Sequence, residues 1–144
     1  MKTNIVTYLV DDSRIDLFIN QKVLSNYSKD LKTKAFQSPV DALEYFRSNL
    51  DQINNRSQDY KQIILIDVNM PVIKGFEFLN ALIHLDNFKE NVFNIYFLSS
   101  SINSEDINKA MSMNNCNGYL NKPLTKDLFK EILSRNETPH QCKA

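Results

Sequence analysis

Residues 5–12 read IVTYLVDD, a run of apolar and β-branched residues that stops abruptly at two carboxylates, Asp11 and Asp12. A short continuous run of this kind predicts a strand that is buried on both faces. Residues 63–67, IILID, repeat the arrangement and stop at Asp67. Because strands buried on both faces occur in parallel sheets that are covered by helices, the two runs together predict an α/β fold.

Strand-like and helical patterns alternate along the rest of the chain. A helical pattern follows each of these runs, and further strands, each followed by a helix, are expected at residues 33–36, 95–98 and 119–120. The first helix is expected to begin with a capping box of Ser13 and Asp16. Its buried apolar face is expected to consist of Ile15, Phe18, Ile19 and Val23. Five such rounds predict a doubly wound (βα)5 sandwich around a five-stranded parallel sheet.

The length of 144 residues corresponds to about one domain. The polar segment between Asp51 and Lys61 is expected to form an extended surface loop, because it can bury little apolar area. Residues 1–135 are therefore predicted to form a single domain, and residues 136–144 a flexible C-terminal tail.

Charge and composition exclude several classes of function. The 17 Lys and Arg residues balance the 17 Asp and Glu residues, so no net charge draws the chain to nucleic acid or to anionic membranes. No apolar run approaches the ~20 residues that cross a bilayer. With only two cysteines and no signal-peptide pattern at its N-terminus, the chain is predicted to be cytoplasmic.

Polar side chains collect at one edge of the predicted sheet. Ligands of an open α/β sheet bind beyond the carboxyl ends of its strands, and these ends carry Asp11, Asp12, Asp67, Ser99 and Lys122. Three carboxylates placed together repel one another, and a divalent cation would relieve that repulsion. Oxygen ligands suit Mg²⁺, whereas Zn²⁺ would require cysteine or histidine. A phosphoryl group on one carboxylate would in addition need the lysine as counter-charge and the serine as hydrogen-bond donor.

Four motifs at these positions resemble those of the receiver domains of two-component response regulators. They are LVDDS at residues 9–13, LIDVNMP at 65–71 with Gly75, LSS at 98–100 and YLNKP at 119–123. In order and spacing, the resemblance extends from residue 5 to about residue 134. It implies a flavodoxin-like, CheY-like sheet with the strand order 2-1-3-4-5.

The resemblance also implies a chemistry for the acidic residues. Asp67 would accept a phosphoryl group from a phosphohistidine of a sensor histidine kinase or of a histidine phosphotransfer protein. Asp12 and Asp67 would bind Mg²⁺ directly, Asn69 through its backbone carbonyl, and Asp11 through water. The receiver would thus catalyse its own phosphorylation and dephosphorylation.

The remaining motif residues would contact the phosphoryl group and transmit its presence. Lys122 would pair with one phosphoryl oxygen, and the hydroxyl of Ser99 would donate to another. Ser99 and Tyr119 would form the switch, in which phosphorylation shifts the population between two conformations and changes the surface of the last two strand–helix rounds.

The sequence therefore favours a stand-alone receiver that signals through contacts with an unidentified protein target, because too few residues follow Arg135 for a DNA-binding output domain. Both a monomer and a phosphorylation-dependent dimer fit this interpretation. One alternative is an aspartyl-phosphate phosphatase or phosphotransferase, which generally needs a general acid two residues after its nucleophile, where this chain has Asn69. The other is a degenerate receiver that acts only as a binding scaffold.

Overall fold

The computed structural model describes residues 4–100 and 103–135, so the predicted tail at residues 136–144 lies outside the described residues. Strands and helices alternate along the described chain in the order β1 (Asn4–Val10), α1 (Arg14–Tyr27), β2 (Lys32–Phe36), α2 (Pro39–Arg56), β3 (Tyr60–Ile66), α3 (Gly75–Ile83), β4 (Phe93–Ser99), α4 (Ser104–Ser112), β5 (Gly118–Asn121) and α5 (Lys126–Ser134). Among the described residues, no helix is both long and apolar enough to cross a membrane.

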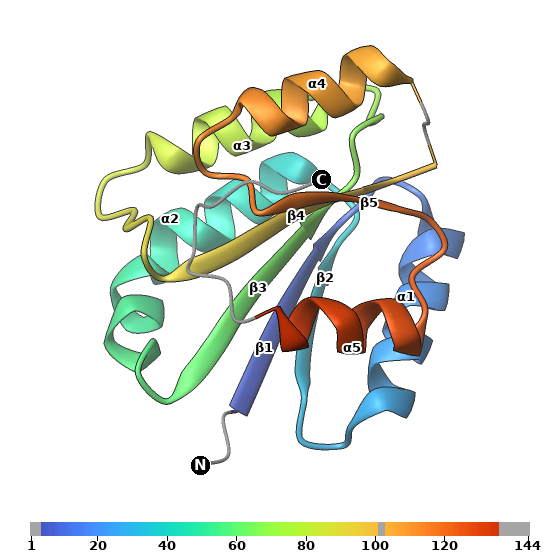
Figure 1. The fold of residues 1–144 in the computed structure, drawn as a ribbon. Coiled ribbons are helices and arrows are strands. Elements are labelled where there is room, and N and C mark those ends of the chain that lie inside the picture. The colour runs from blue at the N-terminus through green and yellow to red at the C-terminus, as the bar shows by residue number, and fades with distance from the viewer. Residues whose placement is uncertain (1–3, 101–102, 136–144) are drawn as a thin grey trace.

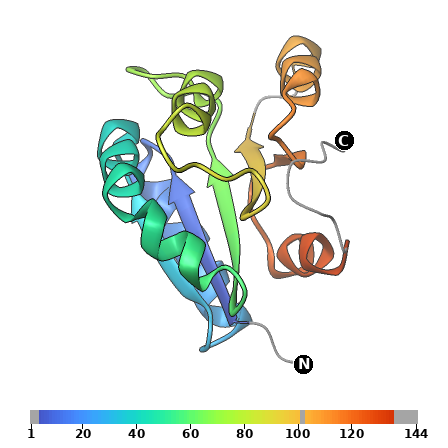
Figure 2. The same ribbon diagram turned by 90° about the vertical axis from the view of Figure 1, so that its left-hand side faces the viewer.

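The strands form one parallel sheet with the order β2-β1-β3-β4-β5. Helices α2, α3 and α4 cover one face of the sheet, and α1 and α5 cover the other (Figure 1). The turned view in Figure 2 shows α2 lying along the part of the sheet that contains β1 and β2. The doubly wound sandwich predicted from the sequence and the strand order implied by the family resemblance are both confirmed.

Each face of the sheet has its own hydrophobic core. Phe46 of α2, Phe78 of α3 and Phe97 of β4 are fully buried on one face. Leu24 of α1 and Phe129 of α5 are fully buried on the other face. Each of these side chains contributes on the order of 1.5–3 kcal/mol of hydrophobic stabilisation. In such a sheet, covered on both faces, ligands are expected beyond the carboxyl ends of the strands.

The prediction of an extended loop between Asp51 and Lys61 is wrong, because most of this segment is helical. Helix α2 continues through Arg56, and β3 begins at Tyr60. Ile53 is buried on the core face of α2 and anchors its last turns. Polar side chains on the outer face of a helix remain solvated, so a mainly polar segment can be helical if a single apolar residue reaches the core.

The predicted buried face of α1 is wrong at Ile15, Phe18 and Ile19, which are exposed, and right at Val23, which packs against the core. Leu17, Asn20 and Leu24 face the sheet, whereas Ile15 and Phe18 are 72% and 65% exposed. The helix carries apolar residues on more than one side, so helical spacing alone does not decide which side is buried. The exposed apolar side chains lie in the first half of α1, next to the end of β1.

Candidate functional site

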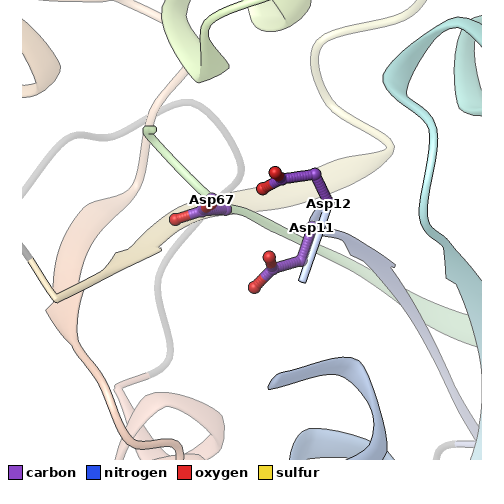
Figure 3. Close-up of side chains that lie close together, drawn as sticks. All are labelled: Asp11, Asp12 and Asp67. Atoms are coloured by element: carbon purple, nitrogen blue, oxygen red, sulfur yellow. The ribbon is translucent and has the colours of Figure 1, made fainter. Parts of the chain in front are cut away.

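Three carboxylates meet at the carboxyl edge of the sheet. Asp11 directly follows β1 and Asp67 directly follows β3; these strands are paired with Val10 beside Ile66, and the backbone N–H of Asp67 donates to the carbonyl of Val10 at 2.9 Å. One carboxylate oxygen from each of Asp11, Asp12 and Asp67 lies within 4.8 Å of the others (Figure 3). Asp11 and Asp67 are buried, and Asp12 is half-buried. The predicted convergence of these acids is therefore confirmed.

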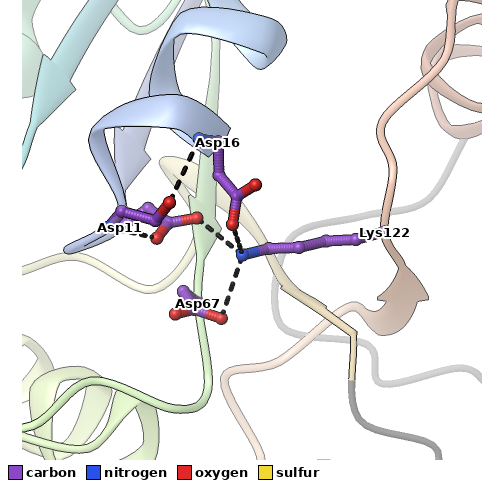
Figure 4. Close-up of polar contacts among 5 residues, drawn as sticks. Asp11, Asp16, Asp67 and Lys122 are labelled. Atoms are coloured by element: carbon purple, nitrogen blue, oxygen red, sulfur yellow. Dashed lines mark hydrogen bonds and ion pairs between the residues drawn. The ribbon is translucent and has the colours of Figure 1, made fainter.

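Lys122, the residue that follows β5, brings an ammonium group into this acidic cluster. Nζ of Lys122 donates to Oδ2 of Asp11 at 2.8 Å and to Oδ2 of Asp16 at 2.8 Å (Figure 4). The same atom forms an ion pair with Oδ1 of Asp67 at 3.4 Å. The Lys122 side chain is only 13% exposed, so water screens these interactions weakly.

Asp16 is a site residue that the sequence interpretation missed. The predicted capping box is only half formed: the Ser13 hydroxyl accepts from the backbone N–H of Asp16 at 3.2 Å, but the backbone N–H of Ser13 donates to Asp11 at 2.9 Å. The Asp16 carboxylate is thus available for Lys122. The sequence feature that could have identified Asp16 is its position four residues after Asp12, at the start of a helix that begins beside the strand ends.

Burial and neighbouring charges both shift the pKa values of this cluster. The pKa of Asp67 is raised to about 6: burial is the largest cause, the charge of Asp11 adds to it, and Lys122 partly offsets both effects. Burial also raises the pKa of Asp11, against the hydrogen bond from Lys122. For Lys122, burial alone would lower the pKa, but hydrogen bonds to Asp11 and Asp16 outweigh it and raise the pKa. The ammonium therefore stays charged at neutral pH.

The raised pKa of Asp67 predicts how stability depends on pH in the absence of metal. Asp67→Asn is expected to stabilise the protein at pH 7 by on the order of 1–3 kcal/mol, because it removes a buried carboxylate that Asp11 repels. The folded-state pKa of about 6 exceeds the ordinary 3.8, so the unaltered protein loses stability as pH rises from about 4 through about 6. Asp67→Asn avoids this loss, and its gain therefore grows over the same range. Below pH 4 the carboxyl is protonated in both states, and the gain disappears.

Urea unfolding in the presence of a chelator measures this gain at acidic and neutral pH. Asp51→Asn, which neutralises an exposed carboxylate on α2, is the control and should give little change at either pH. An equal gain from Asp67→Asn at both pH values would contradict the assignment of a buried, repelled carboxylate to Asp67.

The other three predicted site residues lie around this cluster at different depths. Ser99 is the last residue of β4 and is fully buried, and its backbone carbonyl accepts from the N–H of Lys122 at 2.9 Å. Asn69 is exposed in the loop that follows Asp67. Tyr119 in β5 is half-buried and packs against the core on the side of α2, α3 and α4. Ser99 thus lies at the carboxyl end of β4, beside the cluster, whereas Tyr119 lies within β5 beside Phe97.

A close backbone contact holds the loop after Asp67. The N–H of Gly75, the first residue of α3, donates to the carbonyl of Val68 at 2.9 Å. A Cβ atom at Gly75 would lie 2.4 Å from the carbonyl oxygen of Asp67. Only glycine therefore allows α3 to start this close to the backbone of Asp67, and the helix in turn limits the movement of that backbone.

The residues present suit a hard divalent cation. The cluster offers carboxylate oxygens from three residues at one point, and it contains no sulfur or imidazole donor among the described residues. This donor set favours Mg²⁺ over Zn²⁺. The strand order, the carboxylates and the lysine together define a site for a metal ion and an anionic group.

The family model for the response regulator receiver domain matches residues 7–134. The chain belongs to this family. Receiver domains are signalling domains of two-component systems: they accept phosphoryl groups, interact with histidine kinases or phosphotransfer proteins, and generally bind Mg²⁺ at an acidic pocket. The family that the sequence motifs resemble is thereby confirmed.

Solved structures support the assignment of this chain to the receiver-domain family. A response regulator receiver protein from Dyadobacter fermentans is 28% identical, with 91% of this chain and 96% of that chain covered and a TM-score of 0.78. The chemotaxis response regulator CheY4 of Vibrio cholerae shares the fold at 23% identity, with 92% and 98% covered and a TM-score of 0.66. Comparison with curated protein sequences gave no match.

Proposed function

We propose that this receiver domain accepts a phosphoryl group on Asp67 from the phosphohistidine of a sensor histidine kinase or a histidine phosphotransfer protein. The observation that supports this proposal is the position of Lys122, which follows β5 and whose Nζ contacts Asp11 at 2.8 Å and Asp67 at 3.4 Å. An ammonium held at this place can neutralise charge on a group attached to Asp67 without moving far.

In the proposed transfer, a carboxylate oxygen of Asp67 forms the new bond to phosphorus as the bond between phosphorus and the histidine nitrogen breaks. The electron pair of the broken bond returns to the imidazole nitrogen. Lys122 pairs with one phosphoryl oxygen, and Ser99 donates its hydroxyl to another. Asp67 must be deprotonated to act as the nucleophile, and its pKa of about 6 allows this at neutral pH.

We further propose the ligands of the metal ion. Asp12 and Asp67 would hold Mg²⁺ directly, Asn69 through its backbone carbonyl and Asp11 through water. When bound, the ion supplies positive charge that the three carboxylates lack and that a transferring phosphoryl group requires. Asp12 is the more accessible of the two carboxylates that follow β1, which fits a role at the entrance of the site.

The exposed side of α1 supports a protein as the phosphoryl donor. Ile15 and Phe18 are largely exposed, and they line an open depression together with Asp12 and Gln37. An apolar surface beside an acidic reactive site fits a protein partner that buries this surface while presenting its phosphohistidine. The signal would leave through Ser99 and Tyr119 to a protein target that contacts the β4–β5 side.

Phosphorylation by a small donor tests the chemistry without a partner protein. Incubation with acetyl phosphate and Mg²⁺ is expected to add ~80 Da to the intact mass, the mass of one phosphoryl group on a carboxylate. Asp67→Asn and removal of Mg²⁺ with a chelator should each abolish the gain. Asp51→Asn is the matched control and should retain it. A gain that persists in Asp67→Asn, or that is absent from the unaltered protein, would overturn the proposal.

A further inference from the structure

A cavity of about 290 Å³ lies between α2 and the amino-terminal half of the sheet. Val6 and Gln62, which are paired across β1 and β3, form part of its floor. Asp11 follows Val6 by five positions, just past the end of β1, which corresponds to ~16 Å of extended chain. The cavity is therefore distinct from the acidic site at the other end of the strands.

Positive charge is concentrated around this cavity. Lys32 and Lys34 alternate along β2 and so project from the same face of the sheet, beside Val6 and Tyr8, while Arg56 approaches from the last turn of α2. The lining of the cavity contains no Asp or Glu. Across residues 4–100 and 103–135, no ion pair joins any of these three cations to a carboxylate. In a chain with equal numbers of acidic and basic residues, this is a marked separation of charge.

Two tyrosines position the lysines without neutralising them. Nζ of Lys32 lies 5.2 Å from the centre of the Tyr60 ring and 3.4 Å from its hydroxyl oxygen. Nζ of Lys34 lies 5.2 Å from the centre of the Tyr45 ring. Contacts of an ammonium with an aromatic face hold the side chain in place but leave its full charge available to an anion.

The rest of the lining suits a flat organic group. Val6 and Ile53 provide aliphatic surface, and the two tyrosines provide aromatic surface. Beneath them, the Tyr8 hydroxyl donates to Oε1 of Gln62 at 2.8 Å, so this buried polar pair is satisfied within the protein. Thr33, Asn49 and Gln52 add neutral polar groups to the lining. A cavity that combines apolar surface with a few polar and charged groups is typical of small-molecule sites, and its volume is near the lower end of their range.

We propose that this cavity binds a small phosphate ester that carries a flat ring, of about the size of a nucleoside monophosphate. Lys32, Lys34 and Arg56 would pair with the phosphate, since lysine and arginine are the usual partners of phosphate oxygens. The ring would lie against the tyrosines and the aliphatic surface. This site is independent of the phosphoryl-accepting site and goes beyond the proposed function.

Binding of three related probes to the full chain tests the proposal by titration calorimetry at constant ionic strength and in the presence of a chelator. AMP carries both the phosphate and the ring, ribose 5-phosphate lacks the ring, and adenosine lacks the phosphate. AMP is expected to bind with a dissociation constant of about 1 mM or lower, and more tightly than either of the other probes. Lys34→Gln and Arg56→Gln should each weaken AMP binding by about tenfold, the usual effect of losing one charge-assisted hydrogen bond.

Two matched variants locate the binding. Lys22→Gln removes an exposed positive charge from α1, on the opposite face of the sheet, and should bind AMP like the unaltered protein. Asp67→Asn should also bind AMP unchanged, so that a failure of the phosphoryl-acceptor proposal leaves this result unaffected. Loss of AMP binding in Asp67→Asn would place the nucleotide at the acidic site and overturn the proposal.

Three further outcomes would overturn it. Absence of AMP binding would show that the lysines serve only to discourage the edge strand β2 from pairing with another sheet. Adenosine binding as tightly as AMP would show that the cations do not contribute. Ribose 5-phosphate binding as tightly as AMP would show that the cavity recognises phosphate without the ring.

Discussion

Lys122→Gln is expected to destabilise the metal-free receiver domain by about 3 kcal/mol at pH 7, because removal of one partner leaves buried charges uncompensated. Asp11 and Asp67 are both buried, and Nζ of Lys122 is the cation within 4 Å of each of them in the described chain. Without the ammonium, the carboxylates repel one another in a site that water screens poorly. The loss should shrink as pH falls, because Asp67, whose pKa is already raised to about 6 with Lys122 in place, then takes up a proton.

The same substitution is expected to slow phosphorylation by acetyl phosphate by about 100-fold or more, the effect of removing one preorganised group that stabilises transition-state charge. Stability is measured by urea unfolding and the rate by the time course of the intact mass. Mg²⁺ should restore part of the lost stability in the variant, since it supplies positive charge to the same carboxylates.

Lys130→Gln is the matched control for this experiment. Lys130 is exposed on α5, so the control removes the same charge from the same half of the chain without touching the acidic cluster. It should change neither stability nor phosphorylation noticeably. Equal stability of Lys122→Gln and Lys130→Gln would show that Lys122 does not offset the charge of Asp11 and Asp67.

Gly75→Ala is expected to destabilise the domain by about 1–3 kcal/mol, the usual effect of overpacking a closely packed site. The added Cβ would lie 2.4 Å from the carbonyl oxygen of Asp67 and 2.9 Å from Cα of Val68, which are both backbone atoms. Alanine is the better helix former, but Gly75 is the first residue of α3, where this advantage is small. The backbone that carries Asp67 must therefore move.

This movement should affect metal binding and phosphorylation as well as stability. A displaced Asp67 backbone alters the spacing among the three carboxylates, so Mg²⁺ binding and phosphorylation by acetyl phosphate should both weaken. Asn80→Ala on the exposed side of α3 is the control and should leave both unchanged. Wild-type stability and phosphorylation in Gly75→Ala would show that the contact between α3 and the Asp67 loop is not tight.

The strand ends could be predicted from the sequence because their pattern is local. An apolar run that stops at an acid marks both the strand and its polar end, and Asp11 and Asp67 follow such runs directly. The rule that ligands bind at the carboxyl edge of an open α/β sheet then places acids from different strands together. Lys122 could be added for the same reason, although 111 positions separate it from Asp11.

Helix α1 shows where local pattern is insufficient. Its exposed stripe, with Ile15 and Phe18, and its buried stripe, with Leu17 and Leu24, both have helical spacing. Only the packing against the sheet decides which stripe is covered. The error at residues 51–56 has the same origin, because one contact of Ile53 with the core outweighs the polar composition of the segment.

The amino-acid sequence by itself determined the alternation of strands and helices, the edge of the sheet that carries the acids, and the membership of those acids in one site, because each follows from residue patterns a few positions long. The tertiary structure alone decided that Asp16 binds Lys122, that α3 starts against the backbone of Asp67, and that three cations without a carboxylate partner in the described part of the chain line a cavity beneath α2. These features depend on distances between elements, which arise only when the packing of the two cores places the helices on the sheet.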